Sequence, residues 1–192
     1  MLMIETSYKS NIDNANLELQ KVLTGSLYWL CSEEKTRSNV SKFKVLDILS
    51  TWFKTNEELV KKEPLQRMQL VEYIAGCFWH CSKIEINAKK IFDAKLLPSF
   101  IKMCHIVPDT QLKKEEASDI HYVKSDRNVK ICCSGVLSEC AKIEACQKTM
   151  FEAGVVDSMC RLLQASVSPL LSVNCLDTLG TIADNRKLIV RY

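Results

Sequence analysis

The stretch that decides the fold is residues 129–163, VKICCSGVLSECAKIEACQKTMFEAGVVDSMCRLL. Its apolar residues recur at helical spacing in three blocks, which lie around Val136, Met150 and Met159. The blocks are separated by residues 142–144 and by Ala153-Gly154, and glycine is a common turn residue. This pattern predicts a helix, a short turn, a short helix, a glycine turn and a further helix.

Four of the five glycines stand in the same sequence context, which indicates an internal repeat. The contexts are LTGSLYWLCS at Gly25, IAGCFWHCSK at Gly76, CSGVLSECAK at Gly135 and TLGTIADN at Gly180. A large apolar residue follows each of these glycines two positions later, and the first three copies match at further apolar positions. Successive glycines are about 45 to 59 residues apart. Since helical solenoids repeat at roughly 40–47 residues, the spacing predicts such a solenoid with insertions.

The third copy, CSGVLSECAK followed by CQKTMFEAGVVDSMCRLLQ, resembles an armadillo repeat, and IAGCFWHCSK followed by NAKKIFDAKLLPSFIKM resembles another. The resemblance implies an all-α fold, a right-handed α-solenoid of armadillo-like repeats. We expect one domain over residues 1–192, with repeats at about 15–62, 63–128 and 129–167 and a partial repeat at 168–192. The C-terminal LIVRY resembles the opening of a further repeat.

Apolar spacing and proline positions predict the remaining elements. We expect long helices over about 15–32 and from Pro64 to about Ser82, with shorter helices over 43–54, 87–94 and 97–105. Residues 35–39 read as a polar link, and Ser168-Pro169 as the start of the last long helix. Residues 106–128 are charged and read as an insertion, either a surface loop or a partner-binding or regulatory loop.

Composition narrows the classes of partner and the compartment. The net charge is +3 over 192 residues, which is too balanced to favour nucleic acid or an acidic membrane surface as the main partner. The chain contains no run of apolar residues long enough for a membrane span and no secretory signal pattern. The ten cysteines fall mostly on apolar helix faces, where a reduced thiol acts as a small hydrophobe. We therefore expect a location in the cytoplasm or the nucleus.

No recognised catalytic or phosphate-binding motif occurs in the chain. We therefore expect no enzymatic activity and no cofactor, and a small-molecule ligand is not favoured. The nearest approach to a metal site is Cys77, His80 and Cys81, with Cys104 and His105 later in the chain. Zinc sites need four such ligands, and the spacing of Cys77 and Cys81 is not the usual C-x2-C, so core packing is the favoured interpretation.

The armadillo resemblance also implies a binding surface, because the third helices of such repeats line a groove that contacts partners. The residues expected there stand three before, at, or four after the glycines. We expect the partner-binding residues to be Trp29, Tyr73, His80, Glu139, Asp177 and Asp184. This set passes from aromatic to acidic, which favours a basic or extended protein segment as the partner. The alternative is that the aromatic residues pack between repeats and the acids are solvated.

The predicted function is therefore that of a protein–protein interaction scaffold or adaptor. A module of a larger assembly factor or chaperone adaptor, for example of the myosin or dynein assembly type, is the main alternative. A zinc- or redox-responsive protein is less favoured.

Overall fold

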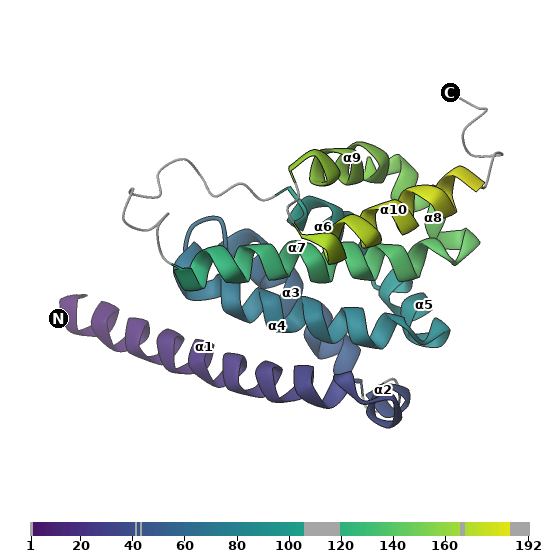
Figure 1. Cartoon of the computed structure of the whole chain (residues 1–192). Helices are drawn as coiled ribbons and strands as arrows, with labels where there is room; N and C mark the ends of the chain where they lie inside the picture. Colours follow the sequence, from purple (N-terminus) through teal and green to yellow (C-terminus); the bar gives the residue numbers. More distant parts are fainter. Residues whose placement is uncertain (1, 41, 43, 106–119, 166–167, 185–192) are drawn as a thin grey trace.

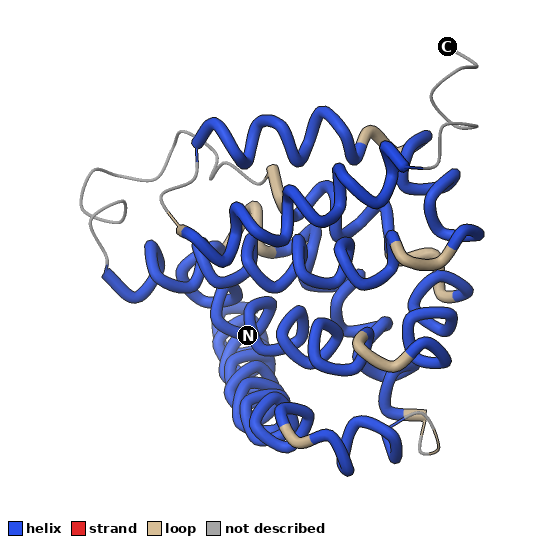
Figure 2. Tube along the Cα trace, turned by 45° about the vertical axis from the view of Figure 1, so that its right-hand side comes forward, coloured by secondary structure: helices blue, strands red, loops and turns tan. Residues whose placement is uncertain are grey.

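The computed structural model describes residues 2–40, 42, 44–105, 120–165 and 168–184. This described part is all-α, as the sequence predicts, and contains no strand (Figure 2). Its helices are α1 (Leu2–Ser32), α2 (Glu34–Val40), α3 (Val45–Leu59), α4 (Pro64–Ser82), α5 (Glu85–Asp93), α6 (Leu97–Met103), α7 (Ile120–Ala141), α8 (Glu144–Glu152), α9 (Val155–Ala165) and α10 (Pro169–Asp184).

After α1, the helices follow in three successive triplets, each with a short helix, a second helix and a long helix. The long helices α1, α4, α7 and α10 pack side by side in chain order, which Figure 1 shows as one helix above another. We call these four helices the long-helix row. Each later member of the row also packs on the helix that precedes it in its triplet, because α3 contacts α4, α6 contacts α7 and α9 contacts α10.

The core lies between the long-helix row and these second helices. Three buried phenylalanines from different elements meet there: Phe53 of α3, Phe78 of α4 and Phe100 of α6. Their ring centroids are 4.7 Å apart for Phe53 and Phe100, 5.5 Å for Phe78 and Phe100, and 6.1 Å for Phe53 and Phe78. Such edge-on and tilted pairs add to the free energy gained from burying the rings. This cluster holds α4 in place between α3 and α6.

The turn before each second helix repeats one backbone feature. Lys44, Lys95 and Gly154 have positive φ angles of 53°, 56° and 81°, and each stands nineteen residues after a repeat glycine. Glycine takes up such angles without steric cost, whereas for a lysine they carry a cost of roughly 1–2 kcal/mol. The sequence identified the turn only at Gly154, because the two lysines give no local signal for it.

Several expected boundaries are wrong. Residues 35–39 are not an irregular link but lie within α2, a seven-residue helix whose buried residue is Val40. Helix α1 begins at Leu2, not near residue 15, and α3 begins at Val45 and continues through the charged residues to Leu59. The polar composition of these segments hides their helical periodicity.

The expected insertion at 106–128 is also partly wrong. Residues 120–128 belong to α7, and residues 106–119 lie outside the described part of the chain. This first section of α7 packs on α4 partly through a polar contact, in which the Asn128 amide donates to the Glu72 carboxylate over 2.7 Å. Because this helix face contacts α4 through polar side chains, its sequence shows no apolar stripe and reads as a loop.

Candidate interaction surface

The long-helix row positions all six residues that the sequence predicts to bind a partner. Trp29 lies on α1, Tyr73 and His80 on α4, Glu139 on α7, and Asp177 and Asp184 on α10. Neighbouring members of the row approach closely because glycine stands at the contact. A Cβ atom added at Gly25 would lie 3.2 Å from the Tyr73 ring, and one added at Gly76 or Gly135 would overlap the ring of Tyr28 or Trp79, respectively.

Three of the six predicted residues are brought together around one ring that the sequence analysis did not single out. The Tyr28 ring centroid lies 5.5 Å from that of Trp29, 6.1 Å from that of Tyr73 and 5.3 Å from that of His80. The Trp79 ring stacks on His80 at 5.7 Å. We call these five residues the aromatic cluster. Tyr28 and Trp79 both stand three residues after a repeat glycine, and that recurrence is the sequence signal for them.

The members of the aromatic cluster differ in how they meet solvent. The Trp29 side chain is 70% exposed, whereas Tyr28, Tyr73, Trp79 and His80 are half-buried. Tyr73 packs over Gly25 between α1 and α4, and its hydroxyl accepts a hydrogen bond of 3.2 Å from Gln69. Tyr73 therefore supports the contact between two helices of the row, and Trp29 is the ring with the largest surface available to a partner.

Two positively charged side chains, Lys83 and Arg37, lie at the His80 end of the aromatic cluster. Burial, together with the nearby positive charges of Lys83 and Arg37, lowers the pKa of His80 below its ordinary value of 6.5. His80 is therefore mainly neutral at pH 7. The Lys83 ammonium lies 5.3 Å from the centroid of the Trp79 ring, which is a favourable cation–π distance.

The acidic residues of the predicted surface fall into two environments. Glu139 accepts a 2.6 Å ion-pair contact from Lys142 and lines a hollow of about 480 Å³ between the C-terminal ends of α4 and α7, where Lys83 and Lys89 also lie. Asp177 and Asp184 are exposed on α10. The structure thus separates Glu139, which is paired with Lys142, from the two aspartates that present charge to solvent.

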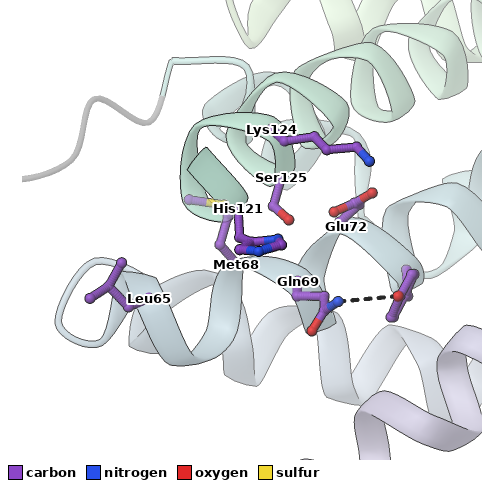
Figure 3. A pocket seen from close by; sticks show the side chains of 8 residues that line it. Leu65, Met68, Gln69, Glu72, His121, Lys124 and Ser125 are labelled. Atoms are coloured by element: carbon purple, nitrogen blue, oxygen red, sulfur yellow. Dashed lines mark hydrogen bonds between the residues drawn. The ribbon is translucent and has the colours of Figure 1, made fainter. Parts of the chain in front are cut away.

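A second hollow, of about 260 Å³, lies between the first halves of α4 and α7 (Figure 3). Figure 3 shows Gln69 and Glu72 of α4 on one side and His121, Lys124 and Ser125 of α7 on the other. Sequence reasoning missed this hollow because it placed residues 121–125 in a loop. Its walls carry both charge signs, so it favours no single class of ligand.

Two of the three cysteines considered as metal ligands, Cys77 and Cys81, lie beside Cys31 of α1, whereas Cys104 lies near Cys175 of α10. The Cys81 thiol lies 3.7 Å from that of Cys31, and the Cys77 thiol lies 3.7 Å from the Thr24 carbonyl oxygen. His105, by contrast, is hydrogen-bonded to Ser158 of α9. Within the described residues, no group of three or more histidine, cysteine or acidic side chains is placed to hold a metal ion.

The sequence matches no family model and no curated protein. None of the helices in the described ranges combines the length and the apolar character that crossing a bilayer requires.

Proposed function

We propose that the protein is an interaction scaffold or adaptor that binds a segment of a protein partner along the long-helix row. The observation that carries the proposal is Trp29, a tryptophan 70% exposed within a packed aromatic cluster. Large exposed aromatic rings on rigid elements are frequent anchors in protein interfaces. The proposal includes no catalytic step and no cofactor.

The architecture we propose is a right-handed solenoid of armadillo-like repeats. Three features support it: the helix triplets, the ordered row of long helices, and the recurrence of a positive φ angle nineteen residues after three repeat glycines. In such an array each repeat contacts its neighbours and presents an extended surface. Trp29 would stand at one end of that surface and Asp184 at the other.

The partner we propose carries an apolar side chain and basic residues in an extended segment. An apolar side chain would pack against the Trp29 ring, which Tyr28 contacts edge-on with the ring centroids 5.5 Å apart. Basic residues would be attracted by Asp177 and Asp184, whose exposure means that they contribute more to association rate and specificity than to affinity. The same surface would serve an adaptor in the cytoplasm or nucleus, or a module of a larger assembly factor.

A display library of extended peptides tests this proposal directly. Peptides selected on the full chain are expected to be rich in lysine or arginine beside a large apolar residue. Trp29→Ala should weaken their binding about tenfold or more, which corresponds to about 1.4 kcal/mol, whereas Asp177→Lys should mainly slow their association. Tyr73 is unsuitable for this test because its loss would disturb the contact between α1 and α4.

The matched control is Ile48→Ala, which removes an exposed apolar side chain from α3, outside the row. The control should bind the selected peptides as the unaltered chain does. Peptides that bind equally to the Trp29→Ala and unaltered chains would place the binding surface elsewhere and refute the proposal.

A further inference from the structure

Helix α1 presents an apolar stripe to solvent on the side away from α4. Leu19, Val22 and Leu30 are 57%, 65% and 55% exposed, and they share one face of the helix by their spacing. Single exposed apolar side chains are common on protein surfaces, but contiguous apolar patches more often mark an interaction site. The stripe stands six before, three before and five after Gly25.

In the later members of the row, these same repeat positions face the preceding long helix. Five residues after Gly76, the Cys81 thiol lies 3.7 Å from Cys31 of α1. Three before Gly76, Tyr73 packs on Gly25 of α1. Six before Gly180, the Asn174 amide donates to the Ile131 carbonyl oxygen of α7 over 3.1 Å. The α1 stripe is thus the face with which a member of the row packs on its predecessor.

At the other end of the row, α10 exposes the complementary face. In α4 and α7 the position four before the glycine contacts the following long helix: Glu72 accepts from Asn128, and Ile131 accepts from Asn174. The equivalent residue of α10 is Leu176, which is 58% exposed. Space is open beside it, because a Cβ atom added at Gly180 would have no neighbour within 4 Å.

We propose that the α1 stripe of one copy of this chain packs on the α10 face of a second copy, head to tail, so that the row continues from one molecule into the next. The contacts inside the chain set the register. The contact of Ile131 with Asn174 places Leu176 against Leu19 of the second copy. The packing of Tyr73 on Gly25 places Val22 of the second copy against Gly180.

The charges at the edge of this contact do not oppose it. Glu18, which borders the α1 stripe, is already paired with Lys21 at 2.6 Å, and Asp177 and Asp184 lie outside the predicted pairs with Leu19 and Val22. A second copy is the favoured occupant because each chain carries both faces, and the two faces follow the repeat positions that meet inside one chain. A contact between unlike faces does not close on itself and can add further copies.

Light scattering after size-exclusion chromatography, over a range of protein concentrations, tests the proposal on the full chain. The α1-face variant is Leu19→Glu with Val22→Glu, and the α10-face variant is Leu176→Glu. We expect the mass of the unaltered chain to rise with concentration beyond twice that of one chain. Each variant alone should stay at the mass of one chain, and an equimolar mixture of the two should reach a mass of two chains and no more, because one intact pair of faces remains.

Ile86→Glu is the matched control, since Ile86 is as exposed as Leu19 and Leu176 but lies on α5, outside the long-helix row. It should associate as the unaltered chain does. Helical content by circular dichroism should be unchanged in all variants; if the α1-face variant loses it, Val22→Ser replaces that variant.

Any of three results would overturn the inference: an unaltered chain that keeps the mass of one chain at the highest concentration, a face variant that still forms dimers alone, or a mixture of the two variants that forms no dimers. The second result would indicate pairing of like faces. Trp29 stands four residues after Gly25, and the equivalent His80 lies 5.3 Å from Tyr28 of the preceding long helix, so association would cover part of the proposed peptide surface. The two proposals are still tested separately, because peptide binding to the single chain and the mass of the face variants are different readouts.

Discussion

The close contact between Trp79 and Gly135 leads to a prediction about stability. An added Cβ at Gly135 would overlap the indole of Trp79, so Gly135→Ala forces the ring or the helices α4 and α7 to move. Overpacking of this kind costs about 1–3 kcal/mol. Alanine also favours the helix over glycine by about 0.5–1 kcal/mol. We therefore expect a net loss of roughly 0.5–2 kcal/mol in the free energy of unfolding.

Gly180→Ala is the matched comparison, because Gly180 holds the same repeat position within α10 and has open space beside it. Within a single chain only the helix preference acts there, so at protein concentrations where the chain is monomeric this variant should be more stable than the unaltered chain by about 0.5–1 kcal/mol. The difference between the two variants isolates the overlap with Trp79. For a chain of this length, each kcal/mol shifts the unfolding midpoint by about 2–4 °C.

Urea unfolding followed by circular dichroism measures both variants. A double-mutant cycle then tests the cause: Trp79→Ala should cost less in the Gly135→Ala background than in the unaltered chain, because the overlap has been removed. The reasoning would be refuted if Gly135→Ala were as stable as Gly180→Ala, or if the effects of Trp79→Ala and Gly135→Ala were simply additive.

Three further predictions concern buried polar and thiol groups. Lys102→Met leaves the buried Glu57 carboxylate without its 2.8 Å ion pair and should lower the free energy of unfolding by about 1–3 kcal/mol. The control Lys61→Met removes an exposed ion pair and should change that free energy by less than about 0.5 kcal/mol, so equal effects of the two variants would contradict the prediction. Burial lowers the pKa of His105 below 6.5, so as pH falls the unfolded chain binds this proton before the folded chain does, and stability should decrease as pH drops through 6.5. In urea titrations at several pH values, His105→Gln should reduce this dependence of stability on pH, and an unchanged dependence would disprove the prediction. Cys160 is exposed and the other nine cysteines are buried, so mass spectrometry should find one rapid maleimide addition per native chain, and rapid labelling of several thiols would argue against this core.

The sequence predicted the long helices because each carries a strong local signal. Pro64 and Pro169 mark the starts of α4 and α10, and the glycine contexts identify the row. The all-α class follows from the same periodicity. The right-handed solenoid and the binding role go beyond these signals and stay predictions.

The sequence failed where polar residues are buried by hydrogen bonds. The first turns of α7 were predicted to be loop because 120–128 has few apolar residues, yet Ser125 is buried and Asn128 bonds to Glu72. A method that reads apolar periodicity cannot detect a helix held in this way. The same limit applies to α2, a seven-residue helix in which Val40 is the buried residue, so its sequence has no apolar periodicity to detect.

The candidate site shows a third kind of limit, since its geometry depends on pairs of residues in different repeats. Tyr28 packs on Gly76 and Trp79 on Gly135, so an aromatic ring three residues after one glycine occupies the space left by the next. The next residue in this series is Ser138, and Gly180 accordingly has no ring beside it. Aromatic residues and glycines therefore have to be read together across repeats to give the register of the row, and a search within single repeats finds the glycine but misses the ring that requires it.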